Sequence, residues 1–159
     1  MYITIAVLVG FLLLFFGLMY FFPGKLEKNI PEEAGEVQLF EAEGLNITRV
    51  PAIGPRKTAY PGAKLRITNK RIIITQKALA TSDLVVREIM LNDKALNQAL
   101  SGQKNWGNVL VAPVNYDSAF SVKGEMLILK NPNAINLDRF EIRGIPIPQN
   151  VLEAVKKVE

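Results

Sequence analysis

The charged side chains that could recognise a ligand are concentrated in one part of the chain. Between positions 44 and 82 every charged residue is basic, and there are eight of them. A segment with one sign of charge attracts anionic groups, and each basic residue beside an anionic membrane contributes about 1 kcal/mol. We predict a binding segment for a lipid headgroup or an acidic protein surface, made of Arg56, Lys57, Lys64, Arg66, Lys70 and Arg71. The alternative is a solvated strand face that binds nothing.

The composition argues against catalysis. The 159 residues include no cysteine and no histidine, which removes thiolate nucleophiles, Ser-His or Cys-His pairs and the common zinc sites. The stretch from Gly54 to Lys64 lacks the residue order of a phosphate-binding loop. Tyr60 is the only aromatic residue in the basic segment, which disfavours a nucleic-acid partner. We therefore expect no enzyme, no catalytic residue, no metal site and no cofactor.

The elements that must position the basic residues are β-strands. Apolar and polar residues alternate, or apolar residues run together, in strand-length segments: 36–40, 45–50, 64–68, 71–75, 84–91, 109–111, 126–129 and 140–143. The segment from Lys64 to Gln76 is predicted to be a hairpin, with Asn69 taking a positive φ in its turn. Alternation also places Lys64 and Arg66 on one side of their strand, opposite Leu65 and Ile67.

One amphipathic helix is expected at the C-terminal end. Val151, Leu152, Val155 and Val158 form an apolar stripe, and Pro148 suits the first turn. The predicted fold is mainly β: a bent sheet or open barrel of about seven strands, capped by this helix. A short helix over 93–100 and a loop over 101–107 are also predicted.

The N-terminal end is apolar. Residues 1–22 carry no charge, and the run from Ile3 to Phe22 has the twenty residues that a helix needs to cross about 30 Å of hydrocarbon. We predict an uncleaved transmembrane helix, because no basic residue precedes the run. Lys25 and Lys28 favour an N-terminus outside and a cytoplasmic C-terminal domain at the cell inner membrane. The predicted organisation is an anchor (1–24), a juxtamembrane tether (25–34) and a β-domain (35–159).

Small residues recur along the predicted anchor. Ala6, Gly10 and Gly17 are spaced by four and seven positions, which places them near one stripe of a helix. Such a stripe lets another transmembrane helix approach closely, so these three residues are predicted to pack on a partner helix. The alternative is that glycine is simply common in such helices.

One stretch has a family resemblance. Residues 62–74, Gly-Ala-Lys-Leu-Arg-Ile-Thr-Asn-Lys-Arg-Ile-Ile-Ile, resemble the signature of bacterial pleckstrin-homology-like and GRAM domains, which end in a capping helix. The spacing of Lys57, Lys64 and Arg66 is similar to the basic pattern of the phosphoinositide-binding members. The segment 93–115 departs from the compact family pattern and is predicted to be an insertion. Its Trp106 would either anchor a partner or fill the core.

Two classes of function agree with these features. The first is a non-catalytic, single-span accessory or scaffold subunit, whose β-domain docks on the cytoplasmic side of an integral membrane complex. The second is a pleckstrin-homology-like or GRAM-like reader of anionic lipid headgroups. The expected partners are therefore the membrane, an integral membrane protein and, for the second class, an anionic lipid. We favour the scaffold, because a protein with its own anchor has little need of weak lipid affinity for targeting.

Overall fold

A computed structural model describes residues 7–14, 26–51, 54, 56–78, 82–92, 111–130 and 138–157. Most of them lie in one eight-stranded sheet: β1 (Gln38–Val50), β2 (Thr58–Thr68), β3 (Arg71–Lys77), β4 (Leu84–Asn92), β5 (Val111–Val114), β6 (Phe120–Lys123), β7 (Met126–Lys130) and β8 (Arg139–Arg143). The short helices are η1 (Glu27–Asn29) and α3 (Tyr116–Ala119), and α4 (Pro148–Lys156) follows the last strand. The prediction of a mainly β fold with a C-terminal helix is confirmed for these residues.

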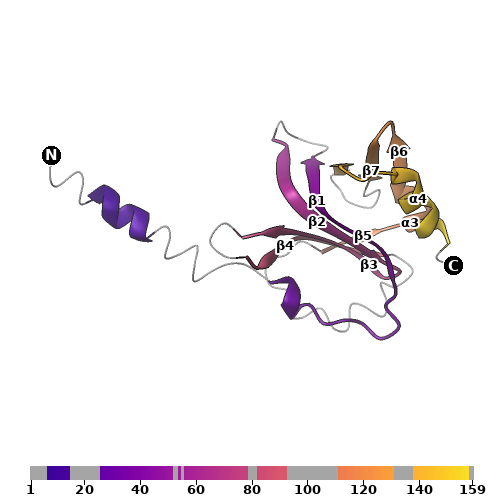
Figure 1. The fold of residues 1–159 in the computed structure, drawn as a ribbon, viewed down its shortest axis with the longest axis horizontal. Helices are drawn as coiled ribbons and strands as arrows, with labels where there is room; N and C mark the ends of the chain where they lie inside the picture. Colours follow the sequence, from indigo (N-terminus) through magenta and orange to yellow (C-terminus); the bar gives the residue numbers. More distant parts are fainter. Residues whose placement is uncertain are drawn as a thin grey trace.

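The order of the strands is β5-β4-β3-β2-β1-β8-β7-β6. Neighbours run antiparallel except β4 and β5, which pair in parallel through Ile89 and Val111. The long strand β1 pairs with both β2 and β8, and it joins the two halves of the sheet. Figure 1 shows β1 and β2 curving together between these halves. Since β5 and β6 are separated only by α3 and Asn115, the two edge strands are connected by a single turn.

Two glycines lie at irregularities within strands that are longer than the predicted ones. Gly44 has φ 74° and lies at a register shift of β1, so the predicted strands 36–40 and 45–50 are one strand. Gly62 has φ 64° and lies within β2, which passes through Pro61. A glycine with positive φ permits a β-bulge, which bends the strand without ending it.

The predicted hairpin of β2 and β3 is confirmed, but its turn differs from the expectation. Leu65 and Ile67 are fully buried, whereas Lys64 and Arg66 lie on the opposite face of β2. No residue other than glycine has a positive φ in the described ranges, so the prediction for Asn69 is wrong. Its side chain has a different role, because it binds the chain that precedes β1.

The main core lies on the inner face of the bent sheet. It contains Ile72, Ile74 and Met90 together with Val151 and Val155 of α4. Pro148 occupies the first turn of α4, where its missing N–H costs no hydrogen bond. In Figure 1, α4 packs beside β6 and β7. The predicted C-terminal helix is therefore confirmed, with Val151 and Val155 turned to the sheet, whereas Val158 of the predicted stripe lies outside the described residues.

The outer face of β3 and β4 is covered by residues 26–37, which we call the strap. Leu26 forms an isolated antiparallel bridge with Val85. Ile30 is 7% exposed and belongs to a second, smaller apolar cluster with Ile73, Val86, Ile89 and Leu91. The segment predicted as a tether over 25–34 is thus packed on the domain from Leu26 onward. This cover explains why β3 is buried on both faces.

The prediction of a transmembrane helix over 1–24 is wrong. Within the described part of the chain, the N-terminal helical stretch covers 7–14, and no helix there is both long and apolar enough to cross a membrane. The prediction rested on the apolar, uncharged composition of the run, which does not by itself determine how the chain folds. The single-pass description that depended on this anchor is corrected with it.

The predicted helix over 93–100, the loop over 101–107 and Trp106 lie outside the described residues. Ala6 and Gly17 also lie outside them, whereas Gly10 belongs to the helical stretch 7–14. A Cβ added to Gly10 would meet no atom within 4 Å. The predicted packing stripe of Ala6, Gly10 and Gly17 therefore stays a prediction.

Candidate functional site

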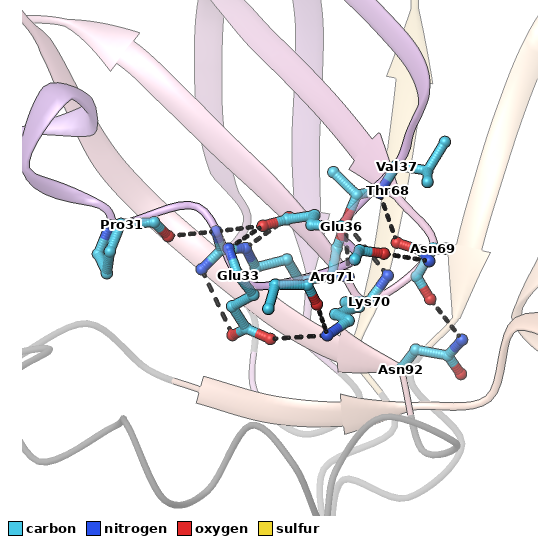
Figure 2. Close-up of polar contacts among 11 residues, drawn as sticks. Pro31, Glu33, Glu36, Val37, Thr68, Asn69, Lys70, Arg71 and Asn92 are labelled. Atoms are coloured by element: carbon cyan, nitrogen blue, oxygen red, sulfur yellow. Dashed lines mark hydrogen bonds and ion pairs between the residues drawn. The ribbon is translucent and has the colours of Figure 1, made fainter.

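The basic residues of the signature stretch bind the strap. Arg71 at the start of β3 is fully buried, and its guanidinium faces Glu36 (Figure 2). Nε donates to Oε1 of Glu36 over 2.8 Å, and Nη2 donates to Oε2 over 2.6 Å. Nη2 also donates to the carbonyl of Pro31 over 2.6 Å, and Glu33 lies 3.7 Å from Nη1. Burial raises the pKa of Glu36, but the hydrogen bonds from Arg71, the Glu33 backbone and Thr68, together with the charge of Arg71, outweigh burial and hold that pKa below its usual value.

The turn that precedes Arg71 binds the same C-terminal half of the strap. The Asn69 amide accepts from the N–H of Val37 over 2.9 Å and donates to the carbonyl of Gly35 over 3.1 Å. The Lys70 ammonium donates to the carbonyl of Ala34 over 2.6 Å. The Thr68 hydroxyl accepts from the N–H of Arg71 over 3.0 Å, which closes the turn. Figure 2 shows these contacts converging on the strap from one side.

A second group of charges lies over β2. The Lys64 ammonium is within 3.5 Å of Glu27, 3.3 Å of Glu41 and 3.6 Å of Glu43. Arg66 lies 3.7 Å from the same Glu27 carboxylate. Burial lowers the pKa of Lys64, but the carboxylates of Glu27 and Glu41 outweigh this effect and raise it. Lys64 and Arg66 are therefore engaged with carboxylates of their own chain.

The six predicted binding residues divide into two groups. Lys64, Arg66, Lys70 and Arg71 form ion pairs with carboxylates of the strap or β1, and the partner of Lys70 is Glu33 at 3.9 Å. Arg56 and Lys57 are exposed in the connection between β1 and β2. Sequence analysis singled out the basic stretch after residue 44, and the stretch before it, Lys25 to Glu43, contains six glutamates and two lysines. It did not identify the two stretches as each other's partners.

A buried polar group, missed by sequence analysis, lies inside the bend of the sheet. The Tyr60 hydroxyl donates to Oε1 of Glu88 over 2.8 Å, and Nη1 of Arg49 donates to the same oxygen over 2.9 Å. Nε of Arg49 donates to Oδ2 of Asp138 over 2.7 Å. Glu88 is 4% exposed and interrupts the apolar run 84–91. A single acidic residue in such a run is the sequence feature from which this buried polar group could have been predicted.

This group works as a cross-link. Arg49 belongs to β1, Tyr60 to β2 and Glu88 to β4, while Asp138 immediately precedes β8. Burial, with the nearby Glu88, raises the pKa of Tyr60 to about 12, and burial raises the pKa of Glu88 despite its hydrogen bonds. Burial lowers the pKa of Arg49, but Asp138 and Glu88 raise it overall. The guanidinium therefore stays charged between its two carboxylates.

The outer face of β6, β7 and β8 carries a shallow hollow of about 270 Å³, lined by Ser121, Lys123, Met126, Ile128, Lys130, Arg139 and Glu141. A larger hollow of about 480 Å³ lies beside the strap and includes the exposed ion pair of Lys28 and Asp83. The described residues contain no cluster of three or more potential metal ligands.

Comparison with known proteins yields no match: no family model, no curated protein and no solved structure is significantly similar to this chain.

Proposed function

We propose that the chain is a non-catalytic accessory or scaffold subunit of an integral membrane complex. The observation that carries the proposal is the exposed apolar surface of the helical stretch 7–14. Seven large apolar side chains there are between 45% and 70% exposed. Contiguous apolar surface that is not buried within a domain marks a site of interaction with a protein or a membrane. The proposal does not require this stretch to span the bilayer.

The charges of the β-domain support docking over headgroup recognition. Four of the six basic residues proposed for binding are paired with carboxylates of the strap or β1. A lipid headgroup would have to displace those carboxylates, two of which bind the fully buried Arg71. The β-domain is therefore a stable unit, and its docking surface is already formed before a partner binds. In this proposal it lies on the cytoplasmic side of the inner membrane, and the absence of cysteine agrees with a reducing compartment.

A pleckstrin-homology-like reader of anionic headgroups is the second candidate. Arg56 and Lys57 favour it, because both are exposed and adjacent. Two basic residues contribute only about 2 kcal/mol near an anionic membrane. That energy alone gives weak binding, so this candidate ranks second.

Co-purification tests the proposal. The full chain is purified in a mild detergent, and mass spectrometry identifies the proteins that migrate with it. Leu13→Asp and Val7→Asp, at the two most exposed apolar positions of the stretch, should release the partner without changing the unfolding temperature of the β-domain. Ile147→Asp introduces the same charge at another exposed apolar residue and serves as the control. Recovery of the parent chain as a lone monomer, or retention of the partner by both variants, would contradict the scaffold.

The same preparation tests the second candidate. Vesicles containing phosphatidylserine should bind the chain only weakly, and Arg56→Glu with Lys57→Glu should not alter assembly with the partner. Strong, salt-sensitive binding to the vesicles that this double variant abolishes would favour the headgroup reader instead.

A further inference from the structure

The hollow on the outer face of β6, β7 and β8 has an apolar floor and a basic rim. Ile128 points away from the main core, yet it is only 6% exposed because its neighbours shield it. Met126 lies beside it and is partly exposed. Lys123 and Lys130 are exposed at the two ends of the paired strands β6 and β7. The hollow thus offers an aliphatic contact between two cationic groups.

The charges of this rim are not balanced within the hollow. Glu141 is its one carboxylate, and the Arg139 guanidinium already binds it through Nη2 over 2.5 Å. Nε of Arg139 is buried and has no hydrogen-bond partner. Within the described ranges, no carboxylate forms an ion pair with Lys123 or Lys130 that would neutralise them. An incoming acidic group would pair with the two exposed lysines and with the exposed part of the Arg139 guanidinium.

The other half of the sheet shows which kinds of residue can cover an outer sheet face that has an apolar centre and basic neighbours. There the strap places Ile30 in an apolar cluster on the outer face of β3 and β4. Acidic residues on both sides of this isoleucine pair with basic residues of β2 and β3, as in the pairs of Glu27 with Lys64 and Glu36 with Arg71. The molecule itself therefore contains an acidic segment, with one buried aliphatic anchor, bound across basic strands.

We propose that the hollow on β6, β7 and β8 binds an extended acidic segment of a partner protein. An aliphatic side chain of that segment contacts Ile128 and Met126, and its carboxylates pair with Lys123, Lys130 and Arg139. The inference rests on the proposed function as a docking subunit, and it names the surface and the chemistry of the partner.

The dimensions and the lining favour a protein segment over other ligands. Sites for small molecules are enclosed and usually have volumes of about 300–1,000 Å³. This hollow is smaller, at about 270 Å³, and lies on an open sheet face. Its lining contains no aromatic residue on which a nucleic-acid base could stack. An aliphatic floor between cations fits a short stretch of acidic and apolar residues.

The experiment uses the purified full chain in non-ionic detergent, without any partner complex. The probe is a fluorescent peptide with one isoleucine flanked by glutamates, and fluorescence anisotropy measures its binding. We expect saturable binding that weakens as salt rises. Lys123→Glu with Lys130→Glu should weaken it about tenfold, because each pair changes from attraction to repulsion. Ile128→Ser should weaken it as well, through loss of the apolar contact.

Lys156→Glu with Lys157→Glu makes the same change of charge on the exposed side of α4, and it should leave peptide binding unchanged. Equal binding of a peptide with glutamine in place of glutamate, or of the Lys123→Glu, Lys130→Glu variant, would overturn the proposal. Vesicles of phosphatidylserine that bind through the same two lysines would assign the hollow to lipid and also overturn it. Since the assay contains no partner complex, its failure would leave the co-purification test of the proposed function intact.

Discussion

Replacing Glu36 with glutamine tests whether the strap is held by a buried ion pair. The variant keeps the shape of the side chain and removes its charge, which leaves the buried Arg71 guanidinium without its main partner. Breaking a buried pair in this way costs about 3–5 kcal/mol. The carbonyl of Pro31 still accepts from Nη2, and Glu33 remains 3.7 Å from Nη1, so we expect the lower end, about 3 kcal/mol. For a chain of this size that corresponds to a fall in Tm of roughly 10 °C.

The assay is thermal and denaturant unfolding of the full chain in detergent, followed by circular dichroism. Because the pKa of Glu36 is lowered in the folded state, its contribution is complete above its usual pKa of 4.5 and is lost as the pH falls further. The stability difference between parent and variant should therefore shrink in acid. Glu32→Gln, at an exposed carboxylate of the same strap, should change stability by less than about 0.5 kcal/mol.

A second variant separates the loss of the pair from a general disturbance. Glu36→Gln combined with Arg71→Met removes both charges, and it should be more stable than Glu36→Gln alone because no buried charge is left uncompensated. A Glu36→Gln variant as stable as the parent at neutral pH, or a double variant less stable than the single one, would refute the reasoning.

Three further predictions concern the core and the strap. The Tyr60 phenol should ionise at about 12 instead of 10.0 in an NMR titration of labelled tyrosine, because burial and Glu88 oppose its ionisation; stability should accordingly fall as the pH rises through this interval. Val151→Ala on α4 should lower the free energy of unfolding by about 1–3 kcal/mol, measured in denaturant. Ile30→Ala should cost about 2 kcal/mol and accelerate amide hydrogen exchange in the strap.

Each of these predictions has a matched control. Tyr60→Phe should abolish the titration near 12, and persistence of that signal would assign it to another tyrosine. Glu153→Ala, on the exposed side of α4, should be neutral or slightly stabilising, because alanine is the better helix former; a loss equal to that of Val151→Ala would mean that burial of the side chain is not responsible. Val37→Ala removes an exposed apolar side chain of the strap. If it accelerated exchange as much as Ile30→Ala, the apolar anchor would have no special role.

Hydrophobic patterns predicted the elements whose burial follows a simple period. The runs at 84–91 and 126–129 became β4 and β7, since buried strands are apolar on both faces. The four-residue strand β6 (Phe120–Lys123) was missed, although its Phe-Ser-Val-Lys sequence alternates apolar and polar residues as the predicted strand 140–143 does. The predicted strand 64–68 is only the second half of β2, which begins at Thr58 and continues through Pro61. Whether glycine or proline ends a strand or bends it depends on neighbouring strands, which sequence alone does not provide.

The candidate site was only partly predictable, because its partners are distant in sequence. The acidic and basic stretches on either side of residue 44 were both visible, and their opposite signs were a usable signal. Arg49 and Asp138 are 89 positions apart, and they meet because β1 pairs with β8. The basic residues were interpreted as a surface for an external anion, whereas most of them bind this chain's own carboxylates. Composition reports charge, but not which charges the fold brings together.

The strap also determines how far the β-domain can move from the partner that binds the stretch 7–14. Twelve residues of unattached chain would add up to about 40 Å of reach. Clamped at Glu27 by Lys64 and at Glu36 by Arg71, residues 26–37 contribute no free length, and the domain is attached from Leu26. A shorter connection raises the effective concentration of the domain at a neighbouring surface. A weak contact through the β-sheet can then suffice for stable assembly, because the partner is never far away.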